Sequence, residues 1–156
     1  MTRSSMVALS LAFVAGAIVG HVAIPSTTAQ AQAHKPVFMT RLFTGPDNQT
    51  HAEEVEVKFS AGSGNEGFKM MPVTAAELRR APGGNFSDWH VGPRRQYVIT
   101  LSGRGEIEVA GGKKIAIGPG HINLIEDLTG KGHITKVVGS EDRVTLQLPI
   151  ADSAGR

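Results

Sequence analysis

The chain has 156 residues, 40% of them apolar and 19% charged, with a formal net charge of +2 and no cysteine. This length suits a single domain, and the composition is that of a packed globule rather than of a disordered chain. The lack of cysteine excludes disulfide bridges, thiolate metal ligands and a cysteine nucleophile. Because the net charge is small and aromatic residues are few, we expect no nucleic-acid partner.

Residues 1–33 have the pattern of an export signal. Arg3 is the charged residue of this segment, an apolar run follows over residues 6–24, and small residues alternate near its end. These are the basic, hydrophobic and cleavage parts of a signal peptide, and cleavage after Ala31 or Ala33 fits equally well. The alternative is a retained anchor, because the apolar run just reaches spanning length. We therefore expect a periplasmic or secreted protein that contacts a membrane only if this segment is not cleaved.

The rest of the chain consists of short strand-like stretches separated by turns. Its 19 glycines and 8 prolines supply the turns, and alternating apolar and polar residues mark half-buried strands. We expect strands over 51–60, 68–73, 96–102, 105–110, 113–117, 121–125, 133–138 and 143–149. Many short strands at close spacing predict a sandwich or small barrel over 51–150, preceded by a linker and leading strand over 34–50 and followed by a tail over 151–156.

Three local patterns add detail to this reading. Gly111 and Gly112 predict a hairpin turn between two of the strands. Thr74 followed by Glu77 is a capping box, which predicts one short helical turn before Pro82. The stretch 88–90 is expected to end a loop just before the strand 96–102.

The spacing of one histidine and several glycines is distinctive. Gly84, His90, Gly92, Gln96 and Gly103 follow one another at the intervals G-x5-H-x-G-x3-Q-x6-G. This resembles the first motif of the cupin superfamily, G-x5-H-x-H-x3–4-E-x6-G. The stretch 118–133 resembles the second motif more loosely, with a Gly-Pro-Gly turn and then a histidine at position 133. Over about residues 50–150 the chain resembles small single-domain bacterial cupins.

The resemblance implies a double-stranded β-helix, that is, a jelly-roll barrel, after the N-terminal signal segment. It also implies a metal site, for which His90, Gln96 and His133 are the candidate ligands, with Fe, Mn, Zn, Ni or Cu as the candidate divalent metals. Cupin sites usually hold the metal with three histidines and one glutamate, whereas here Gly92 replaces one histidine and Gln96 replaces the glutamate. A homodimer is expected by analogy with the family.

Two further residues are candidates for contact with a small-molecule ligand. Arg95 could turn its guanidinium inward and bind a substrate carboxylate, and Asp127 could serve as a general base or an extra ligand. Two functions remain open. One is an exported cupin with a metal-assisted, dioxygenase-like or isomerase-like reaction on a small molecule at the barrel mouth. The other is a metal-free periplasmic cupin that binds a ligand or has a structural role. Whether the chain is an enzyme stays open at this stage.

Overall fold

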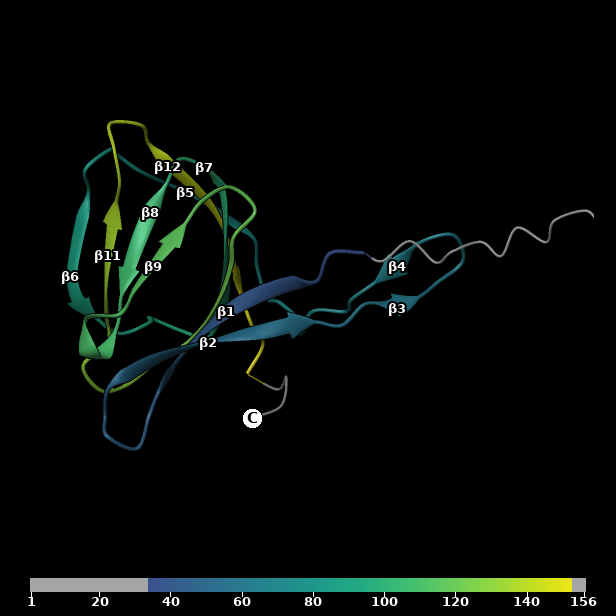
Figure 1. Cartoon of the computed structure of the whole chain (residues 1–156), viewed down its shortest axis with the longest axis horizontal. Helices are drawn as coiled ribbons and strands as arrows, with labels where there is room; N and C mark the ends of the chain where they lie inside the picture. Colours follow the sequence, from purple (N-terminus) through teal and green to yellow (C-terminus); the bar gives the residue numbers. More distant parts are fainter. Residues whose placement is uncertain (1–33, 153–156) are drawn as a thin grey trace, which may run out of the picture. The chain divides into compact units, whose positions relative to one another are not determined.

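The computed structural model describes residues 34–152, whose regular secondary structure is almost entirely β-strand (Figure 1). The strands are β1 (Val37–Thr44), β2 (Thr50–Val57), β3 (Ser60–Ala61), β4 (Glu66–Gly67), β5 (Glu77–Ala81), β6 (Phe86–His90), β7 (Gln96–Ser102), β8 (Gly105–Glu108), β9 (Lys114–Ile117), β10 (Ile122–Glu126), β11 (His133–Val137) and β12 (Arg143–Pro149). A short 3-10 turn, Ala110–Gly112, joins β8 to β9. Within residues 34–152, no helix is long and apolar enough to span a membrane. The predicted signal segment 1–33 lies outside the described residues.

Strands β5 to β12 pair like one long hairpin that has been folded over. At its closed end β8 pairs with β9, and then β7 pairs with β10, β6 with β11 and β5 with β12. Successive pairs belong to alternate sheets, so that one sheet has the order β6-β11-β8-β9 and the other contains β10-β7-β12-β5. This nested pairing is the connectivity of a jelly roll, or double-stranded β-helix. The predicted all-β fold class is confirmed.

The first two strands widen the larger sheet to six strands. β1 pairs in parallel with β10, and β2 pairs with β1 in antiparallel register along its whole length. The range 34–50, predicted to hold a linker and a leading strand, thus contains a strand of the main sheet. After β2 the chain forms the short two-stranded ribbon β3–β4, which extends away from the two sheets (Figure 1).

Three local predictions are wrong. The strand predicted over 68–73 does not form, and within that range only Val73 makes an isolated bridge, to Ile150. The other two predictions fail because a distant segment determines the backbone. The helical turn predicted from the capping box is instead the edge strand β5, paired with β12. The carboxylate of Glu77, which the capping box would need, accepts a 2.7 Å hydrogen bond from Arg94, and the amide of Thr74 donates to the carbonyl of Pro149. The loop predicted to end at His90 is strand β6, paired with β11.

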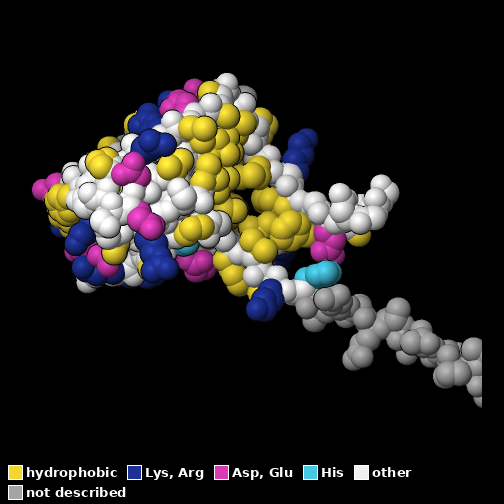
Figure 2. All heavy atoms as spheres, turned by 90° about the horizontal axis from the view of Figure 1, so that it is seen from above, with side chains coloured by type: hydrophobic (Ala, Val, Ile, Leu, Met, Phe, Trp, Pro, Cys, Tyr) yellow, Lys and Arg dark blue, Asp and Glu magenta, His cyan; other side chains and the backbone are white. Residues whose placement is uncertain are grey.

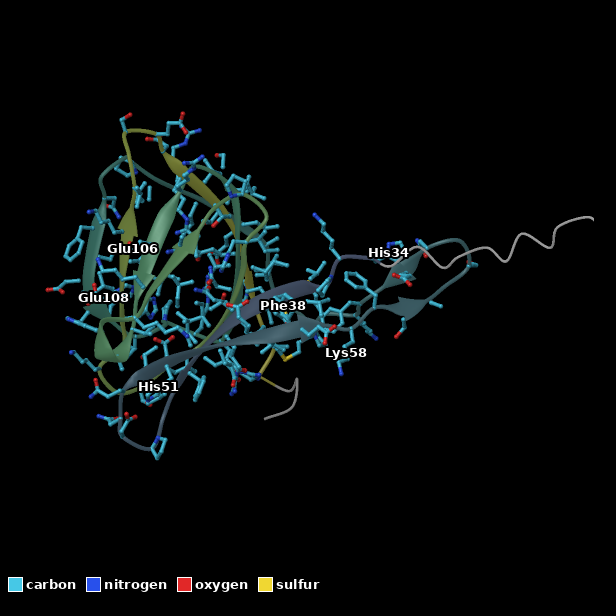
Figure 3. All side chains as sticks on the ribbon, in the orientation of Figure 1. His34, Phe38, His51, Lys58, Glu106 and Glu108 are labelled. Carbon is cyan, nitrogen blue, oxygen red and sulfur yellow. The ribbon has the colours of Figure 1, made fainter. Side chains whose placement is uncertain are left out.

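The smaller sheet has the expected alternation. On β8 the buried residues Gly105 and Ile107 alternate with Glu106 and Glu108, whose carboxylates lie 3.0 and 3.9 Å from the ammonium group of Lys114 (Figure 3). Ile107 belongs to an apolar cluster between the sheets. That cluster consists of Leu42, Ile107, Val109, Ile117 and Ile125. The interior is therefore apolar where β8, β9, β10 and β1 contribute side chains.

Over much of its width the larger sheet buries apolar side chains on its outer face, and there they form a second cluster. This cluster consists of Met39, Val57, Tyr97, Leu124 and Ile150, with Met70 and Met71 packed against it. The amide of Met71 also donates a 3.3 Å hydrogen bond to the hydroxyl of Tyr97, so the segment before β5 lies over this face. Figure 2 shows hydrophobic side chains gathered in a broad band on one face of the molecule. Since side chains alternate along a strand, the neighbours of Tyr97 and Leu124 point into the barrel.

A close backbone approach fixes where β11 begins. Gly132 has a positive φ of 78°, and a Cβ added there would overlap the carbonyl group of His90 on β6. A residue with a side chain would therefore be strained twice, by its dihedral angle and by this contact. Gly132 thus allows His133 to lie directly opposite His90 in the strand register.

The substitution Gly132→Ala should reveal that contact when it is compared with Gly120→Ala. Gly120 also has a positive φ, 83°, but has no atom within 4 Å of an added Cβ. We expect Gly120→Ala to lower the free energy of unfolding by about 1 kcal/mol, the usual cost of a left-handed residue. Gly132→Ala should lower it by at least about 2 kcal/mol more, because the methyl group meets backbone. Urea unfolding of the two variants measures the difference, and equal losses would contradict the close approach.

Candidate functional site

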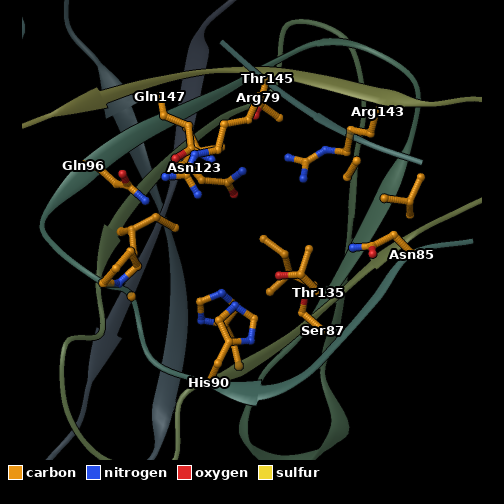
Figure 4. A pocket seen from close by; sticks show the side chains of 18 of the residues that line it. Arg79, Asn85, Ser87, His90, Gln96, Asn123, Thr135, Arg143, Thr145 and Gln147 are labelled. Carbon is orange, nitrogen blue, oxygen red and sulfur yellow. The ribbon is translucent and has the colours of Figure 1, made fainter. Parts of the chain in front are cut away.

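A cavity of about 510 Å³ lies between the two sheets. Its volume is in the range of pockets that hold small organic molecules. Residues of β5, β7, β10 and β12 line it on the larger sheet, and residues of β6, β8 and β11 line it on the smaller sheet. Figure 4 shows that its side chains are mostly polar and come from opposite walls of the barrel.

Two histidines meet at one end of this cavity. His90 is the last residue of β6 and His133 is the first residue of β11, and the two are partners in the strand register. Their ring centroids are 4.5 Å apart and the ring planes make an angle of 53°. The structure thus brings together two of the three residues that the sequence predicts as metal ligands.

Each of the two rings is held through its Nδ1 atom. His90 Nδ1 lies 2.7 Å from the carbonyl oxygen of Asp88, and His133 Nδ1 lies 2.6 Å from Oδ2 of Asp127. A carbonyl oxygen only accepts, and a carboxylate also accepts, so both Nδ1 atoms donate. In the neutral rings Nε2 is then the atom with the free lone pair. Neither Nε2 has a hydrogen-bond partner among residues 34–152, so both can accept a hydrogen bond from a ligand.

Asp127 supports His133 from behind. Its side chain is fully buried, and its Oδ2 also accepts a 3.0 Å hydrogen bond from the hydroxyl of Thr50. Because Asp127 contacts Nδ1, it lies on the other side of the ring from Nε2 and is not among the residues that line the cavity. An Asp–His pair of this kind fixes the tautomer of the imidazole and allows Nε2 to accept a proton. Asp127, predicted as a substrate contact, is placed here as the residue that orients His133.

Gln96 is separated from the histidine pair. It is buried on the inner face of β7, and its Oε1 accepts a 3.2 Å hydrogen bond from Arg94. Figure 4 shows its amide near Asn123 and Gln147, across the cavity from His90. The three residues predicted as metal ligands therefore comprise one close pair and one more distant amide. Their assignment as a ligand set stays a prediction.

The donor set does not fit a metal centre with three or more protein ligands. Within residues 34–152, no group of three or more histidine, cysteine, aspartate or glutamate side chains could hold an ion. At Gly92, where cupins usually have a second histidine, an added Cβ would overlap Cγ2 of the buried Ile125. The side chain of Ile125 is branched at Cβ and cannot easily turn away. Packing of Ile125 against the backbone therefore favours glycine at position 92.

Arg95 is engaged on the outer side of the sheet. Its Nε and Nη2 atoms donate to Oε1 of Glu126 at 2.9 and 2.5 Å, and Arg41 Nε donates to Oε2 of the same carboxylate at 2.6 Å. Burial alone would raise the pKa of Glu126, but the hydrogen bonds from the two guanidinium groups outweigh it and the pKa is lowered. Arg95 is not among the residues that line the cavity, so the geometry gives its predicted role in substrate binding no support.

The sequence reading missed the polar residues at the other end of the cavity. β12 was predicted with its observed bounds, but the prediction did not state which face of the strand points into the barrel. The alternate residues Arg143, Thr145 and Gln147 line the cavity. The same alternation was present in the sequence, and the missing information was which face of the strand points inward.

Several solved structures are similar to this chain, and three of them are the following. The cupin domain of Schizosaccharomyces pombe Cnp3 has 18% identity and a TM-score of 0.44, with 78% of this chain and 87% of that chain covered. An RmlC-like cupin from Desulfovibrio desulfuricans has 13% identity and a TM-score of 0.36, with coverage of 79% and 95%. A putative ethanolamine utilization protein Q from Salmonella typhimurium has 16% identity and a TM-score of 0.38, with coverage of 76% and 99%.

The fold is cupin-like. This conclusion rests on the nested pairing of β5 to β12, and the predicted resemblance to cupins is confirmed at the level of the fold. No family model matches the chain, and no curated protein matches it. With identities below 20%, nothing about ligand or activity follows from the three solved structures.

The anchoring of His133 predicts its tautomer. In the unliganded protein, the ¹⁵N shifts of the neutral form of His133 should show a protonated Nδ1 and an unprotonated Nε2. Asp127→Asn should raise the fraction with a proton on Nε2, because an amide can donate to Nδ1. NMR correlation of the ring nitrogens with the ring protons measures both states.

Asp88→Asn is the matched control. His90 is held by the backbone carbonyl of Asp88 and not by its side chain, so this substitution should leave the tautomer of His90 unchanged. A wild-type His133 with its proton on Nε2, or an unchanged tautomer in Asp127→Asn, would contradict the role given to Asp127.

Proposed function

We propose that the barrel binds a small polar organic molecule in its cavity without a resident metal ion, and that His90 and His133 contact it through Nε2. The observation that carries the proposal is the anchoring of both rings through Nδ1, at 2.7 and 2.6 Å. This leaves two fixed acceptors at a cavity large enough for a molecule of about six carbon atoms. Fixed rings favour binding, because little side-chain entropy is lost when the ligand arrives.

The second candidate is the metal-assisted reaction of dioxygenase-like or isomerase-like type. One observation favours it, since histidines that bind metal usually donate their other ring nitrogen to a carboxylate or a carbonyl group, as both do here. Against it stands the donor set, which offers two imidazoles and no third histidine, cysteine or carboxylate in the described part of the chain. We therefore place the metal-free function first.

Binding of a six-carbon polyol tests the proposal after all metal has been removed with EDTA. D-Gluconate or D-glucitol at millimolar concentration should shift the ¹³Cε1–¹H signals of His90 and His133. The signal of His51, which faces Asp47 at 3.0 Å on the surface, should not move. His133→Ala should weaken binding at least about tenfold because a hydrogen bond in the cavity is lost, and His51→Ala should leave it unchanged.

Two results would count against the proposal. If neither molecule moves the His90 and His133 signals, the cavity is not a site for polar molecules of this size. If the signals move only after Zn²⁺ or Fe²⁺ has been added, and His90→Ala abolishes metal uptake, the metal-assisted function is the correct one.

We further propose that the chain is exported and that the barrel works in the periplasm or outside the cell. The proposal rests on the order of Arg3, the apolar run 6–24 and the alternating alanines in the sequence. N-terminal sequencing of the exported protein should begin at Gln32 or His34. A product that retains Met1 and sediments with membranes would instead identify residues 1–33 as an anchor.

A further inference from the structure

Arg143 is a buried cation at the cavity, at the start of β12. Only 8% of its surface is exposed, and Figure 4 shows its side chain directed into the cavity. Its Nε and Nη2 atoms both donate to the hydroxyl oxygen of Thr100, at 3.2 and 2.9 Å. Nη1 has no partner among residues 34–152, and no ion pair in this part of the chain includes Arg143. One neutral oxygen is thus the acceptor for a group with five N–H donors.

A buried charge without a counter-charge is costly. Burial lowers the pKa of Arg143, and no neighbouring carboxylate opposes this effect. A guanidinium group nevertheless stays protonated in proteins, so the group must keep its charge in the barrel. Buried charges in native proteins are normally paired, and one that lines a cavity can be paired by a ligand.

The other residues around the cavity also favour an anion. Its lining within residues 34–152 includes Arg79, Arg80, His90 and His133 but no aspartate or glutamate. Arg79 and Arg80 have their own partners on the surface, Glu77 at 3.3 Å and Asp142 at 3.8 Å. Arg143 is therefore the cation whose charge remains to be neutralised. Its two-pronged geometry and single charge match a carboxylate group.

A second polar group lies on the same face of β12. Oε1 of Gln147 is buried and has no hydrogen-bond partner among the described residues. A hydroxyl group both donates and accepts, so it suits a side-chain amide. Gln147 lies four positions after Arg143 along the strand, about 13 Å between the Cα atoms, so a ligand that contacts both side chains must be several bonds long.

We propose that the cavity takes a small hydroxycarboxylate, whose carboxylate pairs with Arg143 and one of whose hydroxyl groups bonds to Gln147. This inference rests on the proposed function and names the chemical class of its ligand. The histidine pair contacts another part of the same molecule. Arg143 thus selects the ligand by charge, while the histidines contribute hydrogen bonds that a neutral polyol can also make.

D-Gluconate and D-glucitol test the inference because they differ in a carboxylate and share the polyol chain. Wild-type protein should bind D-gluconate at least about tenfold more tightly, since a buried charge-assisted pair is worth at least that factor. Arg143→Met should bind both molecules equally, at the affinity of D-glucitol. Arg104→Met is the control, because Arg104 is exposed and does not line this cavity, and it should keep the preference. Calorimetric titration measures the affinities.

A stability measurement separates a binding role from a structural one. Without ligand, Arg143→Met should unfold at the same temperature as the wild type or at a higher one, because an unpaired buried charge has been removed. A clear fall in melting temperature together with retained D-gluconate preference would overturn the inference. If Arg143→Met fails to fold, Arg143→Lys is tested instead. Lysine keeps the positive charge but lacks the two-pronged donor of the guanidinium group. D-Gluconate should then bind more weakly than to the wild type, and an unchanged affinity would overturn the inference.

The remaining outcomes distinguish the inference from the proposed function. If the wild type binds D-gluconate and D-glucitol equally and the His90 and His133 signals shift, the inferred preference for a carboxylate is wrong. The proposed binding of a small polar molecule would still hold. Tighter binding of D-glucitol 6-phosphate than of D-gluconate would assign Arg143 to a phosphate and would also overturn it. If no compound moves the histidine signals, the proposed function fails first and the inference fails with it.

Discussion

Over much of its width the larger sheet turns polar side chains into the barrel and buries apolar side chains on its outer face, and the cavity depends on this arrangement. Tyr97 and Leu124 are buried on the outer face, where the segment containing Met70 and Met71 covers them. Because side chains alternate between the two faces of a strand, the neighbours of these residues along the strand point into the interior. A buried polar group needs a partner, and the cavity between the sheets is where those partners are incomplete. The second apolar cluster is thus what makes a polar cavity compatible with a stable fold.

The two ends of the cavity have different chemistry because different strands supply them. β6 and β11 bring two histidines into contact, and groups behind the rings fix both imidazoles before any ligand arrives. β12 brings a charged guanidinium that the protein leaves without a counter-charge. A site with fixed hydrogen-bond acceptors at one end and an unpaired cation at the other is complementary to a molecule that carries hydroxyl groups and one negative charge.

Local sequence signals predicted the local structure well and the non-local structure poorly. The bounds of β12 and the Gly111-Gly112 turn follow from alternation and from backbone freedom, which are properties of neighbouring residues. β5 and β6 were assigned wrongly because their pairing with β12 and β11 decides their conformation. The motif resemblance led to His90 and His133, whereas Arg143 was missed because nothing in β12 itself tells which face the Met70–Met71 segment covers. Packing at Ile125, which only a structure shows, supplies the reason for glycine at position 92.

We infer that the barrel interior is a polar ligand site organised around the buried cation Arg143. The most direct measurement is a crystal structure of the EDTA-treated protein grown with D-gluconate. We expect the sugar acid between the two sheets, with its carboxylate within hydrogen-bond distance of the Arg143 guanidinium. A hydroxyl group should lie within hydrogen-bond distance of Nε2 of His90 or His133. A ligand bound only on the outer surface, or an Arg143 side chain paired with a carboxylate of the protein itself, would contradict the claim.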